Sequence, residues 1–177
     1  MLLRDESAAS ARHWKTASNV SNFVWESVPG SVKIYMNAVD FLDSNIVVYA
    51  YDVSDARKTA IAKNLVKRAQ SGEFVISTQV LAEFCSTYLY RMKPPAAPQD
   101  IIAILQVLAP IRTISPDADI VRRAAEAHDR YGLHFYDGMI VAAAERAGCS
   151  RIWSEDLSPQ QKYFGVEVAN PFVAPQP

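Results

Sequence analysis

The sequence predicts an α/β fold with a parallel central sheet, and three observations lead to this prediction. Short apolar runs alternate with longer amphipathic segments from Met36 onward, which is typical of consecutive strand and helix units. Glycine or proline follows most of the amphipathic segments, as expected where helices stop. Half of the 177 residues are hydrophobic, so the chain can form one compact domain around a substantial core.

The first strand is expected at 38–42 and delivers Asp43 at its carboxyl end. In an open parallel sheet, ligands bind in the crevice beyond the carboxyl ends of the strands, so this carboxylate should point into such a crevice. The apolar run at 46–51 either begins a buried helix or extends the strand, because its periodicity fits both. An alternative role for Asp43-Ser44-Asn45 is a helix cap, in which side chains accept bonds from free backbone N–H groups.

The remaining elements are recognised by the spacing of their apolar residues and by the residues that start or stop helices. Ser77 or Thr78 is expected to cap the helix that carries Glu83. Ser115 is expected to cap a later helix that has Pro116 at its first position. The expected strands are 73–77, 111–114, 151–154 and 166–168, and the expected helices are 55–71, 79–92, 98–108, 116–131 and 138–147.

The first 35 residues differ in composition from the rest of the chain. They are rich in Ser and Ala and lack a sustained period, but they carry Trp14 and Trp25. We interpret residues 1–35 as an N-terminal extension, or the product of an upstream start codon, that precedes a compact domain at 36–177 with a short Pro-rich tail. The alternative is an arm that packs on the domain or on a partner through the two tryptophans.

Composition and charge exclude several classes of protein. The formal net charge is −1, so any nucleic-acid binding must come from a local basic patch. Cys85 and Cys149 form no CxxC pair and no Cys/His cluster, so neither a zinc site nor a disulfide framework is expected. No apolar run has the length of a membrane span or of a signal peptide. We therefore expect a cytoplasmic protein that does not contact a membrane.

Four acidic residues are expected at one edge of the sheet. Asp43 and Asp156 follow strands, whereas Glu83 and Asp137 lie early in helices that follow or flank strands. Each has an ordinary explanation by itself, such as a cap or a charge at a helix N-terminus. Together in one crevice they would repel one another and disfavour ionisation unless a cation were present. Mg²⁺ and Mn²⁺ prefer such oxygen ligands, and they activate water for attack on phosphoryl groups.

This combined pattern resembles the PIN-domain nucleases, and especially the VapC-type toxins of bacterial toxin–antitoxin pairs. The resemblance covers about 36–170 and implies a three-layer α/β/α fold with about five parallel strands. It also implies an endoribonuclease, dependent on Mg²⁺ or Mn²⁺, that leaves a 5′-phosphate and a 3′-hydroxyl. The motifs that carry the resemblance are, in order, Asp43-Ser44-Asn45, Leu81-Ala82-Glu83, Tyr136-Asp137 and Ser154-Glu155-Asp156.

The resemblance also implies roles for individual residues and partners. It places Asp43, Glu83, Asp137 and Asp156 at the acidic quartet that binds metal and catalyses cleavage. It implies a homodimer and a cognate antitoxin whose tail enters the acidic groove. Glu155, beside the quartet, stays open as a further metal ligand. The expected supporting residues are Asn45, Ser77 and Ser154, and the candidates for binding substrate phosphates are Arg91, Lys93, Arg130 and the Arg57-Lys58 pair.

Two other functions remain possible from the residues alone. An aspartyl-phosphate phosphatase also has an aspartate after its first strand. Such enzymes have a second acidic residue two positions later, where this chain has Asn45. A PIN-like domain that binds partners without catalysis is the other alternative. The complete quartet argues against it, because a site without metal has little reason to keep like charges together.

Overall fold

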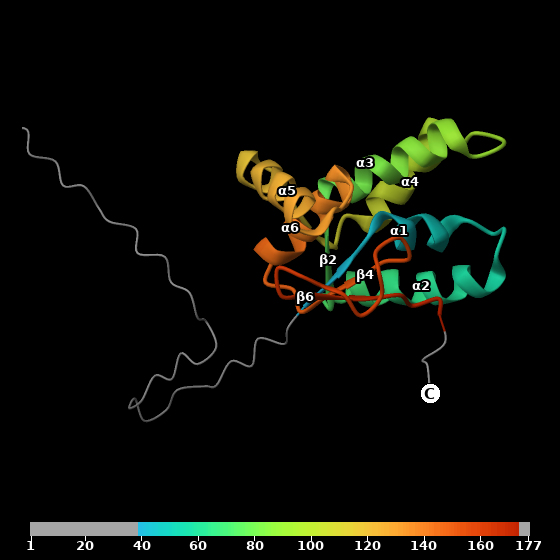
Figure 1. Ribbon diagram of the computed structural model, residues 1–177. Coiled ribbons are helices and arrows are strands. Elements are labelled where there is room, and N and C mark those ends of the chain that lie inside the picture. The colour runs from blue at the N-terminus through green and yellow to red at the C-terminus, as the bar shows by residue number, and fades with distance from the viewer. Residues whose placement is uncertain (1–38, 174–177) are drawn as a thin grey trace, which may run out of the picture. The chain divides into compact units, whose positions relative to one another are not determined.

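The computed structural model describes residues 39–173. The predicted extension at 1–35 and the end of the Pro-rich tail lie outside the described residues. The predicted alternation of strands and helices is confirmed from β1 onward (Figure 1). The elements are β1 Asp40–Leu42, α1 Ser44–Tyr51, α2 Ala56–Gln70, β2 Phe74–Ser77, α3 Thr78–Ser86, the π-helical η1 Thr87–Arg91, α4 Pro98–Leu108, β3 Arg112–Ile114, α5 Ala118–Tyr131, α6 Phe135–Arg146, β4 Arg151–Trp153, β5 Lys162–Tyr163 and β6 Val166–Ala169.

The sheet has six strands in the order β3-β2-β1-β4-β6-β5. The first five in this order pair in parallel, which matches the predicted number. Connections from β1 lead outward through β2 to β3, and the chain then returns to place β4 on the other side of β1. The direction of the connections therefore reverses between β1 and β4, where an open α/β sheet forms its ligand crevice.

The sixth strand, β5, was not expected from the sequence. It has two residues and pairs antiparallel with β6 through a tight turn. Phe164 and Gly165 form this turn with φ angles of 49° and 88°, the left-handed region that two-residue hairpins require. Phenylalanine is an uncommon residue in that conformation, so the sequence carries little signal for the hairpin.

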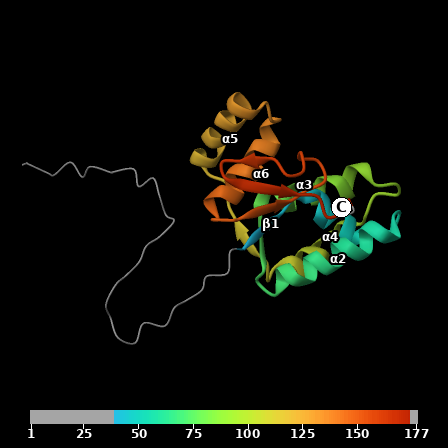
Figure 2. The same cartoon turned by 60° about the horizontal axis from the view of Figure 1, so that its bottom comes forward.

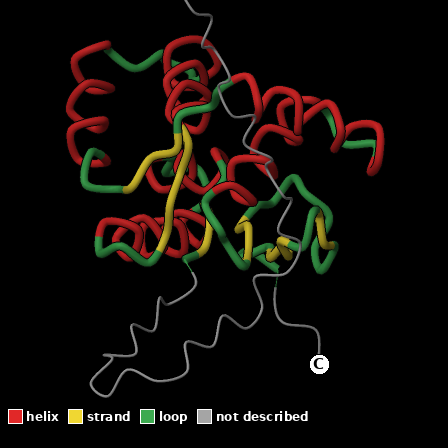
Figure 3. The backbone as a smooth tube through the Cα atoms, turned by 90° about the vertical axis from the view of Figure 1, so that its left-hand side faces the viewer, coloured by secondary structure: helices red, strands yellow, loops and turns green. Residues whose placement is uncertain are grey.

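Helices cover both faces of the sheet, as the three-layer prediction requires (Figures 1 and 2). On one face α6 lies against β2, β4 and β6. On the other face α2 packs against β2, where the Arg68 guanidinium lies 5.1 Å from the centre of the Phe74 ring. Figure 3 shows the chain from the side, with helices next to part of the sheet and loops around its remaining short strands. Within the described residues, no helix is long and apolar enough to cross a membrane.

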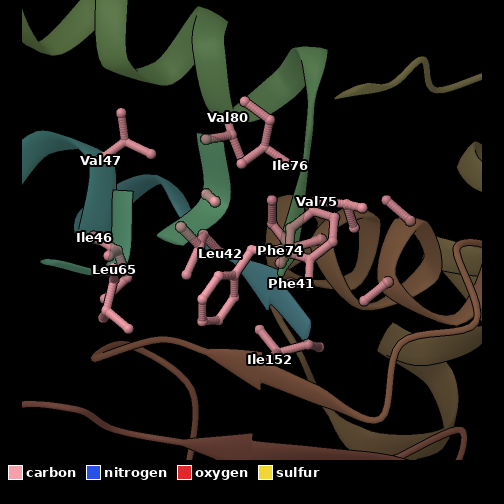
Figure 4. Close-up of a cluster of buried hydrophobic side chains, with 14 of the residues drawn as sticks. Phe41, Leu42, Ile46, Val47, Leu65, Phe74, Val75, Ile76, Val80 and Ile152 are labelled. Carbon is pink, nitrogen blue, oxygen red and sulfur yellow. The ribbon is translucent and has the colours of Figure 1, made fainter. Parts of the chain in front are cut away.

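The core lies around the two central strands (Figure 4). Phe41 and Leu42 of β1 and Ile152 of β4 are completely buried, because each of these strands has a neighbour on both sides and helices above and below. The run at 46–51, for which strand and helix were both open, is helical and buries Ile46 and Val47. This packing fixes the position of the junction between β1 and α1.

Two predicted helix starts are corrected. Helix α5 begins at Ala118 with Asp117 as its cap, whereas Ser115 and Pro116 were expected to cap and open it. The Asp117 carboxylate accepts hydrogen bonds from two backbone N–H groups, at 3.1 Å each. Asp117 therefore has the capping role that was expected of Ser115. Helix α6 begins at Phe135, three residues earlier than expected. Asp137 is therefore the third residue of α6, inside the first turn.

Gly138 allows α6 to approach α5 closely. A Cβ atom at this position would lie 2.8 Å from the carbonyl oxygen of Ala124 and 3.2 Å from its Cα. Both are backbone atoms that a rotamer change cannot move. We expect Gly138→Ala to lower the free energy of unfolding by about 1–3 kcal/mol through overpacking, although alanine usually stabilises a helix interior relative to glycine. Urea unfolding measures the change, and a variant at least as stable as the parent would contradict this packing.

Candidate active site

Asp43 is both the cap of α1 and a buried carboxylate at the carboxyl end of β1. Its Oδ1 accepts a hydrogen bond from the backbone N–H of Ser44 at 2.6 Å, and the residue is only 5% exposed. The cap that the sequence left open as an alternative is present, and it does not prevent the carboxylate from lying buried at the end of β1. The cap fixes one carboxylate oxygen and turns the other, Oδ2, toward β4.

Ser154 connects the ends of β1 and β4 and is completely buried. Its hydroxyl donates to Asp43 Oδ2 at 2.6 Å. The Ser154 Oγ in turn accepts from the backbone N–H groups of Asp156 and Leu157, at 3.1 and 3.2 Å. One side chain thus orients the Asp43 carboxylate and shapes the loop that carries Asp156, at the position where the connections of the sheet reverse.

The Asn45 amide lies between two carboxylates. Its Nδ2 donates to Asp156 Oδ2 at 3.1 Å and lies 3.3 Å from Asp43 Oδ2. Its Oδ1 accepts a long bond of 3.4 Å from the backbone N–H of Glu155. A neutral donor therefore reduces the repulsion between Asp43 and Asp156, and the two supporting residues Asn45 and Ser154 join these two quartet members in one hydrogen-bonded network.

Glu83 reaches the site from α3, and Gln79 holds it there. Ser77, as predicted, caps α3 by accepting from the Val80 N–H at 3.4 Å. One turn before Glu83, the Gln79 Nε2 donates to Glu83 Oε1 at 2.8 Å and to the carbonyl oxygen of Tyr136 at 3.0 Å. Gln79 was not among the residues expected at the site. The available signal was its spacing of four residues from Glu83, which places both on one side of a helix.

The pKa values of Asp43 and Asp137 are both raised, and the charges of Glu83 and Asp156 contribute to each shift. Burial raises the pKa of Asp43 to about 6 against the hydrogen bonds of Ser154 and Ser44, and the charges of Glu83 and Asp156 add to the rise. Burial also raises the pKa of Asp137, with Asp156 and Glu83 adding to the shift and His134 opposing it. Such shifts mark a site where negative charge is under-compensated.

A cleft of about 480 Å³ opens beside this network. Glu83, Asp156 and Asn45 contribute to its lining, and Arg91 lies at its wall. Lys93 is exposed and Arg130 stacks on the Tyr131 ring at 5.2 Å, and neither is among the residues that line the cleft. Arg91 is therefore the best placed of the three predicted phosphate-binding residues.

Lys58 and Glu155 bind each other. The Lys58 Nζ lies 2.5 and 2.7 Å from the two Glu155 carboxylate oxygens and 3.4 Å from the Tyr49 hydroxyl. Burial raises the pKa of Glu155, but the hydrogen bonds from Lys58 and Tyr49 outweigh it and leave the pKa below its usual value. The pair fastens α2 to the loop after β4, which makes Lys58 a poor phosphate ligand and Glu155 a poor metal ligand.

The donor set suits a hard divalent ion. Carboxylate and amide oxygens are the ligands of Mg²⁺ and Mn²⁺, whereas zinc sites use Cys and His. In residues 39–173, no three His, Cys, Asp or Glu side chains already meet closely enough to enclose an ion. Of the four acidic residues, Glu83 and Asp156 line the cleft. Asp43 is buried beside it and is linked to Asp156 through the Asn45 amide, whereas Asp137 is not among the lining residues.

Fold and site together define an α/β protein with a carboxylate-lined crevice at the switch point of its sheet. The sequence profile of the PIN domain family matches residues 41–164, and the chain belongs to this family. Membership supports a nuclease in general terms. A comparison with curated protein sequences gave no match.

Three solved structures illustrate the shared fold. A toxin–antitoxin complex from Klebsiella pneumoniae is 19% identical, with a TM-score of 0.56 over 75% of this chain and 98% of that one. VapC20 of Mycobacterium tuberculosis, a sarcin–ricin loop cleaving toxin, is 20% identical, with a TM-score of 0.51 over 66% and 91%. VapBC2 of Rickettsia felis, bound to a DNA fragment from its promoter, is 18% identical, with a TM-score of 0.52 over 75% and 98%. At these identities the likeness shows the fold alone.

The raised pKa of Asp43 predicts a pH dependence of stability. The folded protein holds the proton up to about pH 6, whereas the unfolded chain releases it near 3.8. Between these values the folded state binds more protons, so its stability should fall as the pH rises. The loss is about 3 kcal/mol, since one pKa unit corresponds to about 1.4 kcal/mol. Unfolding in EDTA from pH 4 to 7 should show this slope in the parent and a flatter one in Asp43→Asn. Equal slopes would contradict the shift.

We expect Ser154→Ala to destabilise the folded state by about 1–3 kcal/mol. The substitution leaves the Asp43 carboxylate without its donor and the N–H groups of Asp156 and Leu157 without their acceptor, and buried groups without partners are costly. Denaturant unfolding measures the loss. Ser158→Ala, at an exposed position four residues further on, is the matched control and should change little. A Ser154→Ala variant as stable as this control would rule out the role of the hydroxyl.

Proposed function

We propose that this protein is a metal-dependent endoribonuclease and the toxin of a toxin–antitoxin pair, acting in the cytoplasm. The observation that carries the proposal is the hydrogen-bonded network of Asp43, Asn45, Ser154 and Asp156 at the switch point of the sheet. This network opens onto a cleft that Glu83 also lines. Family membership supports nuclease chemistry, and a carboxylate-lined crevice is suited to it.

The residues that would hold Mg²⁺ or Mn²⁺ are Asp43, Glu83, Asp137 and Asp156. When bound, the ion supplies an activated water and neutralises charge on the leaving oxygen. Ser154 and the α1 N-terminus keep the Asp43 carboxylate in a fixed orientation, and Gln79 does the same for Glu83. The Asn45 amide spaces Asp43 from Asp156.

The reaction is hydrolysis of an RNA phosphodiester. The oxygen of water bonds to phosphorus, the bond from phosphorus to the 3′ oxygen breaks, and that oxygen takes up a proton. The products are a 5′-phosphate and a 3′-hydroxyl. The likeness to a toxin described as cleaving the sarcin–ricin loop supports RNA as the substrate. Arg91, at the wall of the cleft, is suited to bind a substrate phosphate.

Two protein partners belong to the proposal. The similarity to toxin–antitoxin complexes supports a cognate antitoxin that occupies the acidic cleft. A homodimer is part of the same proposal, and Ile102 and Val107 are exposed apolar side chains on α4 that a partner would cover.

Cleavage of a mixed panel of structured RNAs tests the activity. The purified protein should cut at least one RNA with Mg²⁺ or Mn²⁺ and none with EDTA. We expect Asp43→Asn and Asp137→Asn to lower the rate by about 100-fold or more, because each removes a charge that contributes to several kcal/mol of transition-state stabilisation. Asp129→Asn changes an exposed carboxylate on α5 and should cut like the parent. Full activity in a folded Asp43→Asn variant would refute the assignment.

Metal binding should depend on pH in a direction set by Asp43. Because this carboxyl holds its proton up to about pH 6, protons compete with the ion below that value. We expect Mg²⁺ or Mn²⁺ to raise the unfolding temperature clearly at pH 8 and hardly at pH 5. Differential scanning calorimetry measures both shifts. A protein that binds neither ion at pH 8 would instead be a PIN-like binding module without catalysis.

A further inference from the structure

Tyr136 presents an aromatic ring at the acidic cleft. The residue is 56% exposed, although aromatic side chains mostly bury their rings. It lines the same cleft as Glu83 and Asp156 and directly precedes Asp137. The proposed function assigns roles to the carboxylates around this ring but none to the ring itself.

The surroundings of Tyr136 hold it in place. Its carbonyl oxygen accepts from Gln79 Nε2 at 3.0 Å, and the same nitrogen binds Glu83. Its ring centroid lies 5.8 Å from that of His134, with the two planes tilted by 35°, and the Phe135 ring approaches edge-on at 5.7 Å. The backbone at Tyr136 is therefore anchored, and the neighbouring rings limit the positions of its side chain, which lowers the conformational freedom lost when a ligand stacks on the ring.

Tyr49, the other aromatic residue that lines the cleft, already packs against neighbouring side chains. The Lys58 Nζ lies 4.5 Å from the centre of the Tyr49 ring, and the edge of Phe172 packs against that ring at 5.2 Å. Tyr49 also bonds through its hydroxyl to Lys58. Tyr136 is therefore the cleft aromatic whose ring is available to a ligand.

Arg91 supplies a positive charge to the same cleft. It lies at the end of η1, is exposed, and lines the cleft together with the hydroxyl-bearing Ser86 and Thr87. Among residues 39–173 it forms no ion pair. A flat apolar ring and an unpaired guanidinium beside carboxylates fit a ligand that carries both a base and a phosphate.

We propose that Tyr136 stacks on the base of an unpaired nucleotide next to the cleaved phosphodiester, while Arg91 binds a phosphate of the same strand. The inference rests on the proposed function and assigns the residues that select the substrate. In a duplex, neighbouring bases cover both faces of each base, so the ring can stack only on a base that is unpaired and turned outward. Because every base has an aromatic face, this contact selects an open strand more than a sequence.

The test uses the full chain and an RNA hairpin taken from the panel, cut within its loop. We expect Tyr136→Ala to lower kcat/KM by about 10- to 100-fold, the loss typical of removing one stacked base, and Tyr136→Phe to keep most of the activity. Tyr90→Ala is the matched control, because Tyr90 is 79% exposed but is not among the residues that line the cleft. A 2-aminopurine beside the cut site should be quenched by the parent and by Tyr136→Phe, but not by Tyr136→Ala.

The salt dependence of RNA binding tests Arg91. One lost phosphate contact should reduce the slope of log affinity against log salt by about 0.7 for a single strand. We expect this reduction in Arg91→Ala and not in Lys162→Ala, whose side chain is exposed and is not among the residues that line the cleft. Equal slopes in the two variants would overturn the role of Arg91.

The outcomes separate this inference from the proposed function. A parent protein that cuts no RNA with Mg²⁺ or Mn²⁺ would overturn both. A parent that cuts while Tyr136→Ala cuts equally well would overturn the inference alone. It would also be overturned if Tyr136→Phe lost as much as Tyr136→Ala, or if Tyr136→Ala weakened binding of the antitoxin and left RNA cleavage unchanged, since the ring would then serve a protein interface.

Discussion

The hydrogen bond from Ser154 to Asp43 joins the two strands between which the connections of the sheet reverse direction. These strands are the centre of the sheet, and their side chains form the most deeply buried part of the core. The packing therefore leaves no freedom for the two strand ends to move apart. The start of α1 and the loop that carries Asp156 are both placed relative to this bond.

The burial of Asp43 in this arrangement lowers the stability of the folded protein, but it provides a carboxylate that the proposed function requires. Asp43 is buried in a region of net negative charge, and its ionised form is disfavoured there. A protein selected only for stability would replace it with a neutral residue, as is common where active sites carry strain or unbalanced charge. The surrounding hydrogen bonds from Ser44 and Ser154 limit the penalty without removing it. A bound cation would reverse the balance, because it stabilises the ionised form.

The features predicted correctly from the sequence are those that local pattern determines. The strand before Asp43 and the capping of α3 by Ser77 depend on neighbouring residues, and both are confirmed. Contacts between distant segments could not be predicted in this way. Lys58 and Glu155 are 97 positions apart, and only the folded sheet shows that they neutralise each other. The cap of α5 was assigned to Ser115 because Ser-Pro is a common start signal, although Asp117 offered a stronger acceptor two residues later.

The placement of Gln79 shows a second limit. Its role depends on the carbonyl oxygen of Tyr136, which belongs to a helix more than fifty positions further along the chain. Spacing along α3 suggests that Gln79 lies near Glu83, but it cannot show what the amide binds on its other side. The four acidic residues could be proposed from the sequence, because strand ends and helix starts of a parallel sheet converge at one edge whatever the details of packing.

The π-helical turn of η1 has a consequence for the direction of Arg91. A π turn contains one residue more than an α-helical turn, so every residue after it is rotated by about 100° around the helix axis relative to an uninterrupted α-helix. Thr87–Arg91 is such a turn, directly after the helix that carries Glu83. Loss of one residue here would leave Glu83 in place but change the direction of Arg91, which is the last residue of the turn. A single-residue insertion or deletion in this turn would thus change the position of the Arg91 charge relative to a ligand and leave the carboxylates untouched.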